Sequence, residues 1–363
     1  MKRTSRGIVL SLCITLLVIA CGREVQVEPL GMFGPSRLRH VLGQDGVASI
    51  PFDNSLTLWT FGDTILGSWK GGVSTAATFS ERAIVKNMLP NSLGFTGPLS
   101  SRTVRELDFS FYTEKGKISR FIRSLPGEDP ERKRIWALDG IRLGGSVYVY
   151  YLDIQIDDPG SHMAFSLKGT GLARWNVPPG WKRGDAVDFR RVVTLFGKDE
   201  PAFGGSVIEK DGYIYATGQF STKEFKSFAR IARVPAGEIG KRSAYRFLAP
   251  GGRWTDNLAE SHALFGDVAG ECTLSYNASL GRYVLVYCRL WSGEIAVVRF
   301  ADFRELDAPR VTAVYTPPPL APGSGAHNQF YYSGKEIFSE GRDVFIIYIN
   351  PADYQPYLVR VKL

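Results

Sequence analysis

The sequence predicts an all-β protein folded as a five-bladed β-propeller. Long amphipathic helical patterns are almost absent from the chain. A short apolar or aromatic strand, a Gly/Asn/Asp turn and a second such strand recur five times instead, with second strands starting 61 to 88 residues apart. Each repeat also contains material for outer strands, and four strands repeated about a centre are typical of propeller blades. Two packed sheets are the main alternative.

The five repeats are predicted β-hairpins that supply the inner strands of the blades. They cover Gly46 to Gly62, Leu138 to Leu152, Gly205 to Ala216, Cys272 to Cys288 and Gln329 to Ile349. Outer strands are expected at Phe228 to Val234, Glu294 to Phe300 and Tyr357 to Val361, and a short helix at Ser80 to Met88. Because inner strands run beside the propeller axis, the residues that enter the hairpins are expected to converge at one end of the central channel.

The N-terminus is predicted to be a lipoprotein signal peptide over residues 1–20. Basic residues precede an apolar core, Ile8 to Ile19, which is too short for a stable transmembrane helix. The core ends in Val18 to Gly22 (VIACG), which resembles the lipobox of bacterial lipoproteins, so Cys21 is the expected acylation site. An ordinary secretory signal cut nearby is the alternative. Both interpretations place the protein outside the cytoplasm.

The domain organisation and partners follow from this N-terminus and from the charge. Residues 21–36 are expected to be a tether and residues 37–363 the propeller, lipid-anchored in the cell envelope at the periplasm or cell surface. Removing Lys2, Arg3 and Arg6 lowers the formal charge from +8 to +5. Because the remaining basic residues are dispersed, no nucleic-acid partner is expected. The protein is expected to be a monomer.

Two cysteines flank the fourth predicted hairpin. If residues whose numbers sum to 560 pair across the turn at Asn277 to Gly281, Cys272 and Cys288 lie opposite each other. An oxidising compartment permits a disulfide there, although cross-strand geometry can be strained. Two buried free thiols are the alternative. No Cys/His spacing indicates a metal cluster, and neither a metal nor another cofactor is expected.

The first hairpin brings together two acids at its open end. If Asn54 is the centre of a three-residue loop, Ile50 faces Leu58 and Asp45 faces Asp63. Two carboxylates at that spacing repel by roughly 4 kcal/mol at an effective dielectric constant of 20, so a purely structural hairpin should avoid the pair. Each acid is flanked by a glycine, which allows close approach of backbone or ligand. Solvated or turn-capping aspartates are the alternative.

Further acids are expected at the same end of the channel. Asp139 and Glu271 enter the second and fourth hairpins as Asp45 enters the first, and they are predicted to be supporting acids. Acids that converge can raise one another's pKa and so supply a protonated acid and an ionised base together. Glycoside hydrolysis requires such a pair.

Substrate contacts are predicted for three side chains near this end of the channel. They are Gln44, Trp136 and His327. An aromatic ring such as that of Trp136 can stack on a sugar face, although aromatic residues in strands more often pack in the core. The expected partner is therefore a polysaccharide substrate.

The first hairpin also carries a family resemblance. Gly43 to Gly46 (GQDG), followed by Leu58 to Thr64 (LWTFGDT), resembles the opening signature of a bacterial propeller family long catalogued as a domain of unknown function. Some members of that family are endo-D-arabinanases that cut the D-arabinan of mycobacterial cell walls. Weaker similarities occur at Trp136 to Ile141, Gly205 to Val207, Glu271 to Tyr287 and Ala326 to His327. The resemblance implies a five-bladed propeller with an acid pair at Asp45 and Asp63.

The leading functional hypothesis is a lipid-anchored glycoside hydrolase that acts on a furanoside-type, arabinan-like polysaccharide, with Asp45 and Asp63 as the catalytic pair. A non-catalytic surface propeller that binds glycan or protein is the alternative. Which aspartate is the acid, retention or inversion at the anomeric carbon, the linkage, and endo or exo action all stay open at this point.

Overall fold

The computed structural model describes residues 25–34, 40–70, 83–158, 164–222, 226–320 and 330–363. This part of the chain contains no α-helix, and none of its helical turns could span a membrane. Short 3-10 turns cover Ala236–Glu238, Arg242–Ala244, Pro250–Gly252, Leu258–Glu260 and Phe303–Asp307. The predicted all-β class is therefore confirmed.

Five antiparallel sheets with at least four strands make up most of the described chain. The first has the order β3-β4-β7-β8 (Ala48–Asp53, Leu56–Phe61, Ser92–Thr96, Ser110–Phe111) and the second β11-β12-β13-β14 (Lys133–Leu143, Ser146–Ile156, Phe165–Asn176, Arg190–Gly197). The third contains β15 to β20 (Ala202–Lys210, Tyr213–Ser221, Ser227–Pro235, Arg246–Ala249, Arg253–Thr255, Leu264–Gly266). The fourth is β21-β22-β23-β24 (Thr273–Asn277, Arg282–Cys288, Ile295–Phe300, Val311–Tyr315) and the fifth β25-β26-β27-β1 (Tyr332–Glu340, Asp343–Asn350, Gln355–Lys362, Gln26–Met32).

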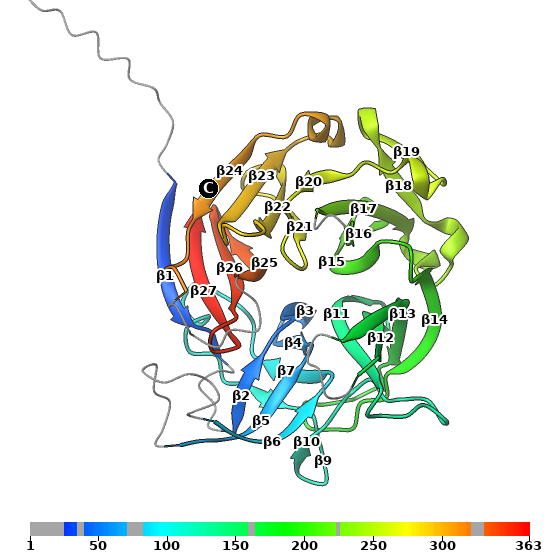
Figure 1. Ribbon diagram of the computed structural model, residues 1–363, viewed down its shortest axis with the longest axis vertical. Helices are drawn as coiled ribbons and strands as arrows, with labels where there is room; N and C mark the ends of the chain where they lie inside the picture. Colours follow the sequence, from blue (N-terminus) through cyan, green and yellow to red (C-terminus); the bar gives the residue numbers. More distant parts are fainter. Residues whose placement is uncertain (1–24, 35–39, 71–82, 159–163, 223–225, 321–329) are drawn as a thin grey trace, which may run out of the picture.

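The sheets are arranged as a ring around a common centre (Figure 1). The first strand of each sheet contacts the first strand of the next, in the order β3, β11, β15, β21, β25 and back to β3. This is the arrangement of a β-propeller, in which every sheet packs its faces against two neighbours. The propeller class is confirmed, and the blade count of five stays a prediction with which these sheets agree.

The N-terminal strand completes the last sheet, and the predicted tether over residues 21–36 is wrong for its described part. β1 pairs with β27 antiparallel, so strands from both ends of the chain lie in one sheet. Strand β1 contains Pro29 and Gly31, which are uncommon inside strands. Because β1 is the outer edge of the sheet, proline is tolerated there, and the register shift between these two residues absorbs the irregularity.

All five predicted hairpins are present as the strand pairs β3–β4, β11–β12, β15–β16, β21–β22 and β25–β26. The expected outer strands are also present, within β17, β23 and β27. The short helix expected at Ser80 to Met88 is wrong, because Ala83–Leu89 forms strand β6. This strand pairs with β5 (Thr64–Trp69), which in turn pairs with β2 (Val41–Gln44), giving a small sheet attached to the first blade.

The fourth hairpin differs from its prediction by one residue. Thr273 pairs with Val286 and Asn277 with Arg282, so the numbers of paired residues sum to 559 rather than to the predicted 560. A slip of one position turns side chains to opposite faces of a sheet. Cys272 accordingly packs in one hydrophobic cluster and Cys288 in another, and both are buried free thiols. The expected disulfide between them is therefore absent.

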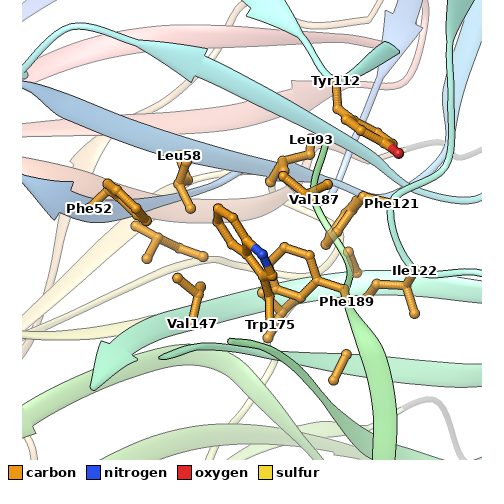
Figure 2. Close-up of a cluster of buried hydrophobic side chains, with 14 of the residues drawn as sticks. Phe52, Leu58, Leu93, Tyr112, Phe121, Ile122, Val147, Trp175, Val187 and Phe189 are labelled. Atoms are coloured by element: carbon orange, nitrogen blue, oxygen red, sulfur yellow. The ribbon is translucent and has the colours of Figure 1, made fainter. Parts of the chain in front are cut away.

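The hydrophobic core lies between neighbouring sheets. Figure 2 shows one such cluster, to which the first two sheets contribute Leu58, Leu93, Val147 and Trp175. Residues of the connecting segments, such as Phe189, close its outer side. A cluster of this kind lies between each pair of neighbouring sheets, so each blade buries both faces and the ends of the inner strands form a mouth.

Candidate functional site

The two aspartates of the first hairpin lie opposite each other at the start of the channel. The N–H of Asp45 donates to the carbonyl of Asp63 (3.3 Å), and the N–H of Gly62 donates to the carbonyl of Asp45 (2.9 Å). A Cβ on Gly62 would lie 2.7 Å from the Asp45 carboxylate oxygen Oδ1, so only glycine allows this approach. The predicted pairing of Ile50 with Leu58 is also observed, but the predicted three-residue loop is wrong: Asp53 pairs with Leu56, and a register shift between Pro51 and Asp53 compensates for the shorter turn.

The carboxylate of Asp45 is partly exposed and is held by two tyrosines. The hydroxyls of Tyr354 and Tyr332 donate to its Oδ2, at 2.6 and 3.2 Å. Burial raises the pKa of Asp45 to about 6; the Tyr354 hydrogen bond opposes this shift, and the charge of Glu271 adds to it. At neutral pH this group is mostly ionised.

Asp63 is more deeply buried, with 8% of its surface exposed. The indole Nε1 of Trp136 donates to its Oδ1 at 3.0 Å. Burial and the nearby charge of Asp45 raise the pKa of Asp63 to about 8, against the opposing effects of Arg134 and the Trp136 hydrogen bond. At neutral pH this carboxyl is therefore mostly protonated, whereas Asp45 is not.

The two supporting acids are in the same mouth. Asp139 accepts hydrogen bonds from the backbone N–H groups of Gly140 (2.7 Å) and Val207 (2.8 Å). Burial raises its pKa to about 7, and the charge of Lys335 opposes that shift. Glu271 accepts a hydrogen bond from the Ser333 hydroxyl and acts electrostatically on Asp45. The charges of Asp45, Asp63 and Glu271 thus act on one another, whereas Asp139 is influenced by the charge of Lys335.

One predicted substrate contact, Gln44, is buried, and two further predicted residues lie outside the described part of the chain. Gln44 is 1% exposed and donates to the hydroxyls of Thr64 (3.2 Å) and Ser92 (3.4 Å). It supports the strand pair beneath the acids, and the predicted substrate contact is wrong because no surface is available for one. His327 and Cys21 lie outside the described residues.

Three site residues were missed by sequence reasoning, namely Tyr332, Tyr354 and Lys335. Lys335 is 1% exposed, and its Nζ has no hydrogen-bond partner among the described residues. Tyr354 lies between the second and third strands of its sheet, and Asp63 likewise follows the second strand of the first sheet. The equivalent positions of Tyr354 and Asp63 in their blades could have identified Tyr354 from the sequence, because the turn after the second strand opens on the same face in every blade.

The described residues contain no group of three or more His, Cys, Asp or Glu side chains arranged to hold a metal ion. A cavity of about 30 Å³ lies beside Glu271 and Cys272. A larger hollow of about 570 Å³ is lined by His262, Phe265 and Arg289 and contains none of the four acids.

The fold and this acid-lined mouth define the chain as a β-propeller protein with a carboxylate site at the entrance of its channel. Residues 43–335 match the DUF4185 family, a domain of unknown function, and the chain belongs to that family. The resemblance stated from the first hairpin is confirmed at this level. No curated protein matches the chain significantly.

Solved structures share the fold. A protein from Bacteroides ovatus ATCC 8483, provisionally described as a hydrolase, has a TM-score of 0.65 and 16% identity, over 90% of this chain and 87% of that chain. RS223 β-xylosidase has a TM-score of 0.50 and 11% identity, over 92% and 94% of the two chains. At these identities the likeness concerns the fold.

Proposed function

We propose that the protein is a glycoside hydrolase in which Asp63 is the general acid and Asp45 is the base or nucleophile. One observation supports this assignment above the others. Two aspartates that face each other just outside the first hairpin share a mouth, yet their environments raise one pKa to about 8 and the other to about 6. Paired carboxyl groups with separated pKa values are what glycoside hydrolysis requires at neutral pH.

The proposed reaction accounts for each proton. Asp63 gives its proton to the glycosidic oxygen as the bond to the anomeric carbon breaks. Asp45 either removes a proton from an attacking water or attacks the anomeric carbon itself, after which water releases the sugar. The Tyr354 and Tyr332 hydroxyls stabilise the Asp45 carboxylate, and the indole of Trp136 orients Asp63.

Asp139 and Glu271 are proposed to orient substrate and tune these pKa values. The buried Lys335 ammonium favours the ionised form of Asp139, whose two backbone hydrogen bonds fix its direction. A fixed carboxylate at the mouth is suited to accept hydrogen bonds from sugar hydroxyls. These residues are thus assigned to binding and electrostatics rather than to bond cleavage.

The proposed substrate is a furanoside-containing, arabinan-like polysaccharide outside the cytoplasm. This finer assignment is supported by the resemblance of the first hairpin to a family that includes endo-D-arabinanases. The proposed location, lipid-anchored through Cys21 in the cell envelope, is supported by the lipobox-like sequence alone.

The test is release of reducing ends by the purified protein from arabinans, arabinogalactan and unrelated glycans. Asp45→Asn and Asp63→Asn should each lower the rate by roughly 10² to 10⁴, the usual contribution of general acid–base groups. Asp53→Asn is the matched control, because Asp53 lies in the exposed turn of the same hairpin. Equal activity of all three folded variants would refute the assignment, and glycan binding without release of sugar would favour a non-catalytic binder.

A further inference from the structure

The turn after strand β22 presents an unusual tryptophan. Trp291 is 66% exposed, and its φ of 71° lies in the left-handed region. A bulky residue rarely adopts this backbone conformation, and a large exposed aromatic ring gains nothing from core packing. Both features carry a cost in folding, and such costs are retained chiefly at functional sites.

The turn that carries Trp291 is held firmly. The guanidinium of Arg289 donates to Asp267 (Nε to Oδ2, 2.7 Å) and to Glu294 (Nη1 to Oε2, 3.1 Å). The N–H of Gly293 donates to the carbonyl of Arg289 at 3.0 Å, which closes the turn. The indole is therefore presented from a preorganised support, which reduces the entropy lost when a ligand binds.

The topology places Trp291 on the same face as the acids. Trp291 lies between the second and third strands of the fourth sheet. Asp63 follows the second strand of the first sheet, and Tyr354, which bonds Asp45, lies between the second and third strands of the fifth. Because the sheets repeat around one axis with the same strand order, these turns all open on the mouth side.

Trp291 is linked to the acid pair through Phe330, which packs against it and lies close in the chain to a tyrosine that binds Asp45. The ring of Phe330 meets the indole edge-on, with centroids 5.5 Å apart and an interplanar angle of 73°. Two residues later, the hydroxyl of Tyr332 donates to Asp45. Two residues of extended polypeptide span at most about 7 Å, so the backbones of Phe330 and Tyr332 are close together. A glycan chain bound at the acids can therefore reach the aromatic pair.

A second aromatic pair lies on another side of the acids. Trp136, which bonds Asp63, meets the ring of Phe165 with centroids 5.0 Å apart. Phe165 is 36% exposed and begins the third strand of the second sheet, again at the mouth face. Aromatic surfaces therefore flank the carboxyl groups on the second blade and on the junction of the fourth and fifth.

We infer that Trp291, supported by Phe330, is a stacking platform for a sugar ring of the polysaccharide at a subsite away from the bond that is cleaved. The apolar face of a sugar ring can cover the exposed indole and remove both surfaces from water. This inference rests on the proposed function, because a glycan chain bound at the acids is what brings a sugar within reach. A platform on either side of the acids fits binding of a chain interior.

The test compares Trp291→Ala and Trp291→Tyr with the wild-type protein on long arabinan chains and on short arabino-oligosaccharides. Trp291→Ala should raise KM for long chains by roughly tenfold, while kcat and the cleavage of the shortest substrates stay within about twofold. Trp291→Tyr should recover most of the loss. Tyr276→Ala is the matched control, because Tyr276 is 40% exposed at the end of β21 that points away from the mouth.

Binding of arabinan to the Asp63→Asn variant, with and without Trp291→Ala, separates this inference from the hydrolase proposal. If Trp291→Ala cleaves long chains as fast as the wild type does, the platform is overturned and the hydrolase proposal stands. Binding without cleavage, weakened by Trp291→Ala, would overturn the hydrolase and support the platform. Absence of both binding and cleavage would overturn both. Loss of self-association in Trp291→Ala with unchanged glycan binding would assign the indole to a protein contact and overturn the platform.

Discussion

The hydrogen bond from Tyr354 to Asp45 makes a specific prediction about the dependence of activity on pH. Replacing Tyr354 with phenylalanine removes only the hydroxyl that donates to Asp45 Oδ2 at 2.6 Å. This hydrogen bond lowers the pKa of Asp45, so its removal raises that pKa above its present value of about 6. Asp45 must be ionised to act as base or nucleophile, and the acidic limb of the pH–rate profile therefore moves to higher pH.

The size of the shift follows from the strength of the bond. A hydrogen bond to a charged group contributes about 1.5 to 3 kcal/mol, and one pKa unit corresponds to about 1.4 kcal/mol. Because Asp45 is partly exposed and keeps its bond from Tyr332, the lower end applies, and we expect about one unit. At pH 6 the variant should lose most of its kcat/KM, and at pH 8 it should be close to wild type.

The matched control acts on the other aspartate. Trp136→Phe removes the indole donor to Asp63 and keeps an aromatic ring, so the pKa of Asp63 rises and the alkaline limb moves upward instead. The assay is kcat/KM from pH 4 to pH 10 on a glycan that the wild type cleaves, with folding checked at each pH. The reasoning is refuted if Tyr354→Phe moves the alkaline limb, or if both variants move the same limb.

Two further predictions concern stability. Burial raises the pKa of Glu336 to about 7, so folding favours its protonated form, and stability falls as pH rises from about 4.5 to 7. Glu336→Gln should therefore reduce the drop in melting temperature between pH 5 and pH 8, and an unchanged drop would contradict this account. Phe33 packs against Trp59 with ring centroids 5.1 Å apart and follows strand β1. Phe33→Ala should cost about 3 to 5 kcal/mol in urea unfolding, against about 0.5 kcal/mol or less for the exposed Val192→Ala; equal costs would show that the N-terminal segment does not hold the last blade.

The local features of this protein could be predicted from its sequence. Each hairpin joins neighbouring strands through a short turn, and alternation of apolar residues specifies which face is buried. Asp45 and Asp63 meet because both belong to the first hairpin, and the pairing of Ile50 with Leu58 gave their register in advance. The prediction for the fourth hairpin failed in register alone, because the paired residue numbers sum to 559 rather than to 560.

Features that depend on distant segments could not be predicted in this way. Strand β1 pairs with β27 at the other end of the chain, and local patterns do not specify such a distant partner. The tyrosines that hold Asp45 come from the fifth blade, and Lys335 becomes a site residue only when the ring closes. Turn residues and the alternation of apolar and polar side chains act within a hairpin, so neighbouring residues in the sequence specify them. Burial at the mouth, and with it the unequal pKa values of the two aspartates, arises only when sheets from the whole chain surround them, because desolvation depends on every neighbour in space.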